Sequence, residues 1–142
     1  MFRNRINEEL GYLIKEVQQD LRKKMDNSLI NINLTTPQYA VLSQLKEYPG
    51  LSNAELSRKS FVTPQTMNLI VQNLEDRHFV IRSHSKNHGK IMNTEITESG
   101  VAILEKANVL VFEVEEQIFG GLLKKESNNL RMILQKLRKK SP

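Results

Sequence analysis

Two helix start signals lie close together near the middle of the chain. Ser52 is followed three residues later by Glu55, the pattern of a capping box, and Thr63 is followed by Pro64, a hydroxyl cap before a proline. Their spacing leaves room only for a short helix, ending near Ser60, and a turn of three residues. Two helices joined by so tight a turn are typical of a helix-turn-helix motif, which commits the middle of the chain to a helical fold.

Apolar residues at helical spacing predict further helices on both sides of this motif. In chain order, the predicted helices cover roughly residues 7–25, 37–48, 53–60, 63–77, 98–119 and a final leucine-rich segment around 130–137. The polar stretch 26–33 loosens the pattern after the first helix, and Thr35 and Thr97 are predicted caps. His78 is expected in the left-handed conformation that usually falls to glycine after a helix.

The period of the apolar pattern changes to two after the 63–77 helix. Residues 79–82 and 92–96 are predicted to be strands, with the tip of a hairpin at residues 87–89. A helix-turn-helix followed by such a hairpin is a winged helix-turn-helix. We therefore predict a mainly α-helical chain with a small β-hairpin, whose winged helix-turn-helix core covers residues 34–97.

The flanking segments, residues 1–33 and 98–142, carry narrow apolar stripes that a lone chain of this length would leave partly exposed. We expect them to be N- and C-terminal dimerisation helices that pair with a second copy. The residues proposed for that interface are Leu13, Val17, Leu130 and Leu137. Core and flanks together form one predicted domain of 142 residues.

Four stretches, in register with one another, resemble one known family: 34–42 (LTTPQYAVL), 51–56 (LSNAEL), 63–74 (TPQTMNLIVQNL) and 96–100 (ITESG). They are similar to the multiple-antibiotic-resistance regulator (MarR) family. The resemblance implies a homodimeric winged-helix transcription factor that binds pseudo-palindromic promoter DNA and is commonly released by a small, often phenolic, ligand. Three features depart from the family pattern. His78 replaces a usual glycine, Leu69 stands where arginine is frequent, and residues 88–90 (HGK) replace Asp-x-Arg at the wing tip.

One face of the predicted 63–77 helix is polar and lies opposite its apolar stripe. Amides pair bidentately with adenine, and threonine contacts a thymine methyl group or a phosphate, so this face is predicted to contact DNA. Its residues are Gln65, Asn68 and Gln72, with Thr63 and Thr66 at the leading end. An ordinary solvated face is the alternative interpretation. On the wing, a cationic arm is expected to meet DNA through Arg82, Lys86, His88 and Lys90.

Three tyrosines are candidates for an effector pocket. Tyr12, Tyr39 and Tyr48 have the side chains to line a cavity that accepts a small aromatic carboxylate. Tyrosines on helices also simply pack with the hydroxyl at the surface, and this alternative stays open. The small aromatic effector is therefore a hypothesis that the resemblance supports.

The sequence argues against a metal site and against enzymatic activity. His78, His84 and His88 lie close together in sequence, but no carboxylate neighbours them, so solvated or phosphate-facing histidines are favoured over a zinc site. Glu113, Glu115 and Glu116 have no partner base or nucleophile, and no catalytic or phosphate-binding motif is present. We predict no cofactor, no metal and no enzymatic activity.

The absence of cysteine excludes disulfides and thiolate zinc sites, and no apolar run approaches the ~18 residues of a membrane span. We expect a cytoplasmic protein. The net charge of +5 comes mainly from residues 124–142, which carry seven Lys/Arg against one Asp/Glu. The leading hypothesis is a dimeric DNA-binding repressor. The alternative is a winged-helix protein-interaction module without sequence-specific DNA reading, suggested by the altered wing tip and the modest charge of residues 51–97.

Overall fold

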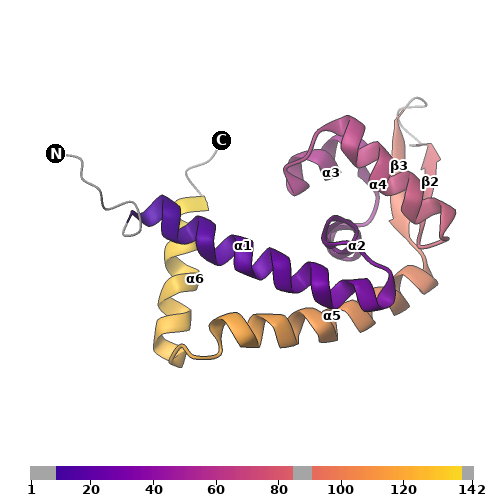
Figure 1. Cartoon of the computed structure of the whole chain (residues 1–142). Helices are drawn as coiled ribbons and strands as arrows, with labels where there is room; N and C mark the ends of the chain where they lie inside the picture. Colours follow the sequence, from indigo (N-terminus) through magenta and orange to yellow (C-terminus); the bar gives the residue numbers. More distant parts are fainter. Residues whose placement is uncertain (1–8, 85–90, 139–142) are drawn as a thin grey trace. The chain divides into compact units, whose positions relative to one another are not determined.

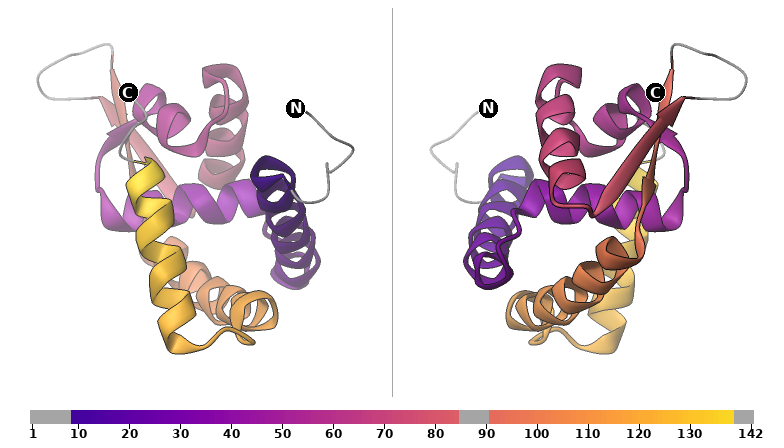
Figure 2. Two further views of the ribbon diagram at one scale, coloured as in Figure 1. Left: turned by 90° about the vertical axis from the view of Figure 1, so that its left-hand side faces the viewer. Right: turned by 90° about the vertical axis from the view of Figure 1, so that its right-hand side faces the viewer.

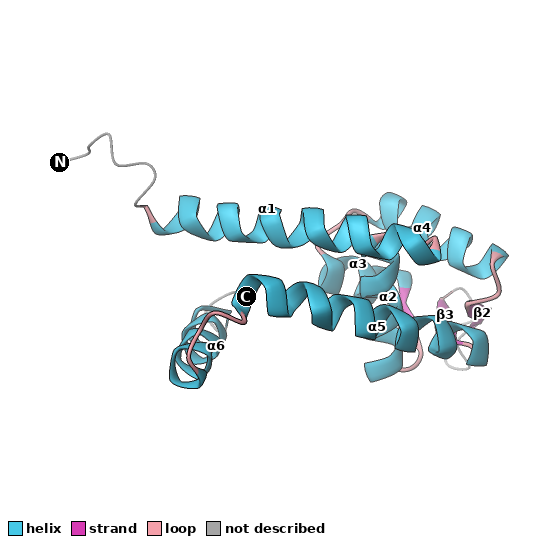
Figure 3. Cartoon of the chain, turned by 60° about the horizontal axis from the view of Figure 1, so that its bottom comes forward, coloured by secondary structure: helices cyan, strands magenta, loops and turns pink. Residues whose placement is uncertain are grey.

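The structure, a computed structural model, describes residues 9–84 and 91–138. Helices dominate the described chain, and the strands form one small antiparallel sheet (Figure 3). This confirms the predicted fold class. In chain order the elements are α1 (Leu10–Leu29), the 3-10 helix η2 (Ile30–Ile32), α2 (Thr36–Glu47), β1 (Leu51–Ser52), α3 (Asn53–Ser60), α4 (Pro64–Asp76), β2 (Val80–His84), β3 (Met92–Ile96), α5 (Glu98–Phe119) and α6 (Lys124–Arg138).

The described residues fall into two compact units. The winged-helix unit, residues 25–111, contains α2, α3, α4 and the sheet, with the adjoining parts of α1 and α5. Within it, α4 packs against α3 and lies beside the β2–β3 hairpin (Figures 1 and 2). The second, helical unit contains the first part of α1, the last part of α5, and α6. The core of the winged-helix unit includes ten side chains that are essentially buried: Leu29, Val41, Leu42, Leu45, Leu56, Met67, Val71, Leu74, Val80 and Ala107.

Helix α1 is longer than the sequence predicts. The polar stretch 26–33 was expected to loosen the helix, but α1 continues to Leu29 and is followed directly by η2. The reason is burial, because Leu29 is fully buried in the core and Met25 packs against it. This apolar contact outweighs the weak helix propensity of the polar residues between them. The chain leaves η2 at Asn33, whose φ is 55°.

The start of α2 has the predicted threonine cap. Thr35 Oγ1 accepts from the backbone N–H of Gln38 at 3.2 Å, and Gln38 Oε1 accepts from the backbone N–H of Thr35 at 3.0 Å. Gln38 also donates through Nε2 to Asn73 Oδ1 at 2.7 Å. Since Asn73 lies on α4, this capping residue also ties α2 to the second helix of the helix-turn-helix.

The sheet has three strands, one more than the sequence predicts. Strand order is β1-β3-β2, with Leu51 opposite Thr94 and Val80 opposite Ile96. The two predicted strands are present, the first shifted to Val80–His84. β1 was missed because it has only two residues, too few for any periodicity. The predicted hairpin tip at residues 87–89 lies outside the described residues.

The junction between α4, β2 and α5 is held by a group of short contacts. His78 has a φ of 65°, which confirms the predicted left-handed residue after α4. Its carbonyl accepts from Thr97 Oγ1 at 2.7 Å and from Ser99 Oγ at 2.8 Å. Thr97 Oγ1 also accepts from the backbone N–H of Gly100 at 3.0 Å, which is the predicted cap of α5. The start of α5 is thereby fixed to the end of α4.

The capping box of α3 has the predicted geometry. Ser52 Oγ accepts from the backbone N–H of Glu55 at 3.2 Å, and Glu55 Oε1 accepts from the backbone N–H of Ser52 at 3.1 Å. The hydrogen bond from the Ser52 backbone is the main reason that the pKa of Glu55 lies below its ordinary value, with help from the Ser52 hydroxyl.

Replacing Ser52 by alanine is expected to lower the free energy of unfolding by about 1 kcal/mol near pH 7, because the cap is lost. The Glu55 contribution depends on pH. A carboxylate with a depressed pKa stabilises the fold above its ordinary pKa of 4.5, and this stabilisation is lost as the pH falls through the folded-state pKa. The difference between wild type and Glu55→Gln in urea denaturation should therefore shrink from pH 7 to pH 3. A difference that is independent of pH would contradict this explanation.

Candidate nucleic-acid interface

The helix-turn-helix forms where the sequence predicts it. Helices α3 and α4 are joined by residues 61–63, and the backbone N–H of Val62 donates to the carbonyl of Ser57 at 3.2 Å across the turn. The side chain of Asn53 donates to the carbonyl of Pro64 at 3.1 Å. The first residues of α3 and α4 are thus bonded to each other, which fixes where α4 begins.

Helix α4 has one buried and one exposed face, as predicted. Met67, Val71 and Leu74 are buried in the core. The residues predicted to contact DNA are all exposed: Thr63, Gln65, Thr66, Asn68 and Gln72. Leu69 is 70% exposed among these amides, so the face is not uniformly polar.

The two threonines at the leading end of α4 are bonded to each other. Thr63 Oγ1 accepts from the backbone N–H of Thr66 at 3.1 Å, and the two hydroxyl oxygens are 3.0 Å apart. Thr63 is therefore the N-cap of α4. Its hydroxyl has a structural role whether or not it also meets DNA.

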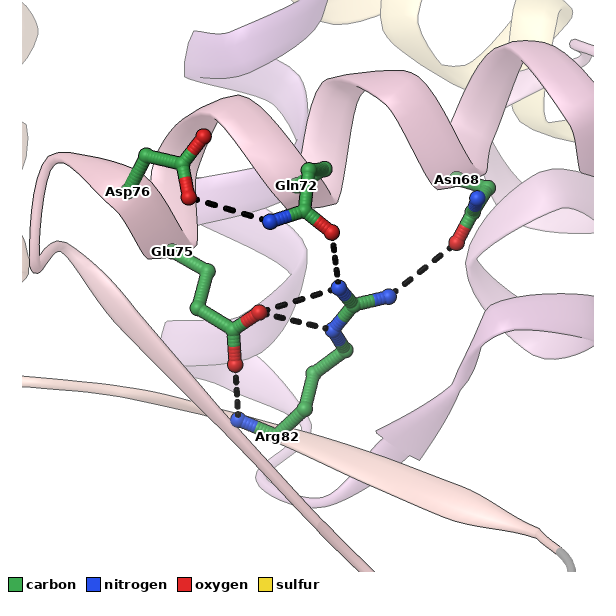
Figure 4. A network of polar contacts seen from close by, with 5 residues as sticks. All are labelled: Asn68, Gln72, Glu75, Asp76 and Arg82. Atoms are coloured by element: carbon green, nitrogen blue, oxygen red, sulfur yellow. Dashed lines mark hydrogen bonds and ion pairs between the residues drawn. The ribbon is translucent and has the colours of Figure 1, made fainter.

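Arg82 on β2 reaches across to α4 and contacts three of its side chains (Figure 4). Its Nε and Nη2 donate to Glu75 Oε1 at 3.2 and 2.9 Å. Nη2 also donates to Gln72 Oε1 at 2.7 Å, and Nη1 donates to Asn68 Oδ1 at 3.0 Å. Gln72 Nε2 donates in turn to Asp76 Oδ1 at 3.0 Å. Two predicted helix contacts and one predicted wing contact are thus joined in one network.

Sequence reasoning missed Glu75 as the partner of Arg82. The signal was present, because Asn68, Gln72 and Glu75 recur at four and three residues and so share one face of α4. The strand that follows folds back beside this helix and carries the arginine. The Arg82 side chain is only 17% exposed in the ion pair, so it differs from the freely solvated cation expected of a wing arm.

The rest of the predicted cationic arm lies outside the described residues. Lys86, His88 and Lys90 fall between the end of β2 and the start of β3. Beside the hairpin the structure has a cleft of about 360 Å³. It is lined by Ser52, Asn53, Ala54, Asn68, Arg82, Ile91, Met92 and Thr94. Arg82 and Asn68 therefore border a concave surface between α3, α4 and the wing.

The structure places the three candidate effector tyrosines at separate positions. Tyr39 lies in the first turn of α2 and donates its hydroxyl to Asn108 Oδ1 at 2.9 Å. Tyr48 follows the other end of the same helix, roughly 13 Å along its axis, and Lys59 Nζ lies 4.3 Å from its ring centroid. Tyr12 belongs to the helical unit. These positions leave the shared effector pocket a prediction.

The helical unit contains an apolar groove of about 460 Å³. It is lined by α1, the end of α5 and α6 through Leu13, Ile14, Val17, Gln18, Leu21, Ile118, Phe119, Leu122, Leu130 and Leu134. Three of the four residues predicted for the dimer interface are among them. The fourth, Leu137, lies on α6 one turn beyond Leu134 and is 53% exposed. Three of the four predicted interface residues therefore border one apolar groove.

Comparison with known proteins decides the family. Residues 34–92 match the sequence profile of the MarR family. The chain is also 34% identical over 128 residues to the HTH-type transcriptional repressor Rv2887 of Mycobacterium tuberculosis, a match that covers 90% of this chain and 92% of that protein. The chain belongs to the MarR family. It is therefore a winged-helix transcriptional regulator and not an enzyme, as the sequence predicts.

Solved structures of Rv2887 resemble this MarR-family chain along most of its length. The complex of Rv2887 with DNA has a TM-score of 0.76 at 31% identity, and the match covers 91% of this chain and 97% of that one. The complex with salicylic acid has a TM-score of 0.75 at 33% identity, covering 91% and 96%. Rv2887 has thus been crystallised both with DNA and with an aromatic acid.

Two further features of this MarR-family chain concern metals and membranes. Among residues 9–84 and 91–138, no three His, Asp or Glu side chains are grouped closely enough to hold a metal ion. His78, two residues before β2, and His84, the last residue of β2, are within this part, whereas His88 is not. In the same part of the chain, no helix combines the length and apolar character of a membrane span.

Proposed function

We propose that this MarR-family regulator is a homodimeric repressor that binds a pseudo-palindromic DNA operator and leaves it when a small aromatic acid binds. The observation that carries the proposal is the exposed amide face of α4, placed directly after the helix-turn-helix turn. The 34% identity to a protein named a transcriptional repressor supports repression over activation. As a regulator of DNA it would act in the cytoplasm.

The proposed DNA contacts follow from which side chains α4 exposes. With α4 in the major groove and its N-terminal turns leading, Gln65 and Asn68 lie nearest the base edges. Gln72 lies further along the same face, and Thr63 and Thr66 meet the flanking backbone. On the wing, Lys86, His88 and Lys90 are the proposed phosphate contacts, whereas the fourth residue of the predicted arm, Arg82, has its guanidinium bonded to side chains of α4.

The homodimer is proposed from the apolar groove of the helical unit. Leu13, Val17 and Leu130 are 41%, 46% and 37% exposed, and they line the groove together. Exposed apolar side chains gathered in one groove are typical of an interaction site. A second copy related by a twofold axis covers it with the same surface, and the twofold axis matches that of a pseudo-palindromic operator.

The effector is proposed by chemistry and by analogy. Rv2887 has been crystallised with salicylic acid, an aromatic carboxylate. Tyr12, Tyr39 and Tyr48 remain the residues proposed to line the effector pocket here. Among them Tyr39 offers the best-defined hydroxyl, already oriented by Asn108. Salicylate should lower the affinity of the protein for its operator and leave its affinity for random DNA less affected.

Replacing Gln65 by alanine is expected to reduce operator affinity about fivefold or more, because a good bidentate base contact contributes about 1–3 kcal/mol of discrimination. The operator is first selected from randomised duplexes, and affinity is then measured by fluorescence anisotropy across a salt series. Affinity for random DNA and its salt dependence should stay nearly unchanged, since an amide neutralises no phosphate.

The matched control for this test is Gln19→Ala, which removes another exposed amide, from α1, and should change neither affinity. Equal losses on operator and random DNA would assign Gln65 to phosphate contact. A wild-type protein that binds no duplex with salt-dependent affinity would refute DNA binding and favour the protein-interaction module.

A further inference from the structure

We infer that Arg82 is a positioning residue that sets how α4 reads bases, by turning the amide oxygens of Asn68 and Gln72 inward and their amino groups toward DNA. The inference rests on the proposed function. It also corrects the simplest chemical expectation for this face, which is bidentate pairing of its amides with adenine. The contacts in Figure 4 carry the argument.

The direction of the amides follows from the chemistry of the guanidinium. Arginine has only donors, so an amide that faces it must present its oxygen. Nη1 lies 3.0 Å from Asn68 Oδ1 and Nη2 lies 2.7 Å from Gln72 Oε1. Gln72 is fixed a second time, because its Nε2 donates to the carboxylate of Asp76. If either amide were flipped, its amino group would face the guanidinium, and two donors would then meet without an acceptor.

Glu75 holds the guanidinium in place. It accepts from Nε and Nη2 of Arg82, and its second oxygen accepts from the Arg82 backbone N–H at 3.3 Å. The ion pair is partly shielded, with 17% of the Arg82 side chain and 33% of the Glu75 side chain exposed. With Nε, one N–H of Nη2 and the backbone N–H of Arg82 bonded to this carboxylate, the other N–H of Nη2 and those of Nη1 are left for the two amide oxygens.

The consequence concerns which base atoms are recognised. Bidentate pairing with adenine requires the amide oxygen to accept from the N6 amino group. In Asn68 and Gln72 that oxygen already accepts from a cation, and such charge-assisted bonds are about twice as strong as neutral ones. Because both oxygens are turned toward Arg82, Asn68 offers the N–H donors of Nδ2, and Gln72 offers the one Nε2 N–H that does not bond to Asp76. Their partners are therefore base acceptors: N7 of adenine or guanine, guanine O6 or thymine O4.

Gln65 provides an internal contrast. Its side chain is exposed and has no hydrogen-bond partner among residues 9–84 and 91–138. It keeps both donor and acceptor for a base. The face of α4 is thus divided between one amide free to pair in either direction and two that only donate.

The test deletes single atoms from the operator. Operator positions are assigned to Asn68 by selecting from randomised duplexes with wild type and with Asn68→Ala. At those positions, one duplex lacks the base acceptor, through 7-deazaadenine, 7-deazaguanine or a thymine without O4. Another lacks the amino group of adenine or cytosine. Wild type should lose roughly fivefold on deletion of the acceptor and less than twofold on deletion of the amino group, whereas Asn68→Ala should respond weakly to both.

Arg82→Lys then tests the positioning role. Lysine keeps a cation beside Glu75 but lacks the planar fork that reaches both amides. We expect the acceptor-deletion effect to fall below twofold and base preference to broaden at the Asn68 and Gln72 positions only. Positions assigned to Gln65, the thermal midpoint and the affinity for random DNA should stay close to wild type. Arg77→Lys is the matched control, since Arg77 bonds to Gln38 and stacks on Phe79 instead.

The outcomes separate this inference from the proposed function. If deletion of an amino group costs wild type as much as deletion of an acceptor, the oxygens face DNA and the inference is overturned. If Arg82→Lys weakens operator and random DNA alike, Arg82 contacts phosphates instead. If Arg82→Lys fails to fold, the duplexes with wild type and Asn68→Ala still decide which way the amides point. Absence of any duplex binding by wild type would refute DNA binding itself.

Discussion

Gly100→Ala is expected to destabilise the fold by about 3 kcal/mol, a loss of roughly 10 °C in the thermal midpoint. A Cβ at this position would lie 2.2 Å from the carbonyl oxygen of Phe79 and 2.7 Å from Ile96 Cγ1. The oxygen belongs to the backbone and already accepts from the N–H of Thr97 at 3.0 Å, so it has no freedom to move aside. Relief requires α5 to separate from the start of β2.

The matched control is Gly11→Ala. Gly11 also lies in a helix, but a Cβ there meets no atom within 4 Å. Alanine should be neutral or slightly stabilising at that position, because it has the better helix propensity. Both variants are compared with wild type by calorimetry at one protein concentration, since any self-association makes the midpoint concentration-dependent. Equal midpoints for Gly100→Ala and wild type would mean that the α5 junction yields easily.

The features that sequence predicts correctly are those whose partners are close in the chain. Thr35, Ser52, Thr63 and Thr97 each cap a helix by accepting from a backbone N–H three residues later. Such a contact depends on local conformation alone, so residue type and spacing suffice to find it. The turn and the start of α4 follow from the same signals. The winged helix-turn-helix is thus largely a local property of this sequence.

The features that sequence misses depend on partners far along the chain. The last turn of α1 persists because Leu29 is buried in the core, which no local pattern reports. β1 exists because Leu51 pairs with Thr94 in β3. At the candidate interface, exposure of the α4 amides followed from periodicity, but their direction did not. The direction of the amides is set by Arg82, which lies on β2 and is placed beside α4 by the turn between them.

Leu130→Asp is expected to dissociate the proposed dimer and, with it, most operator affinity. Leu130 lines the apolar groove on α6 and is 37% exposed in the single chain. Burying a large apolar side chain contributes roughly 1.5–3 kcal/mol, and a twofold interface contains the residue twice. A carboxylate there would also have to lose its hydration without a partner. We expect the dimer dissociation constant, measured by sedimentation velocity over a dilution series, to rise at least 100-fold.

The matched control adds the same charge to the other side of the same helix. Asn128 lies two residues before Leu130, so it projects from the opposite face of α6, where it accepts from Arg131 at 3.1 Å. Asn128→Asp keeps that acceptor and should leave dimer and operator affinity unchanged. Because one protomer reaches only one half-site, Leu130→Asp should lose operator affinity at protein concentrations where it is monomeric and recover part of it as concentration rises. A Leu130→Asp protein that sediments as a wild-type dimer would place the interface on another surface. One that is monomeric yet binds the operator as tightly as wild type would instead separate DNA reading from dimerisation.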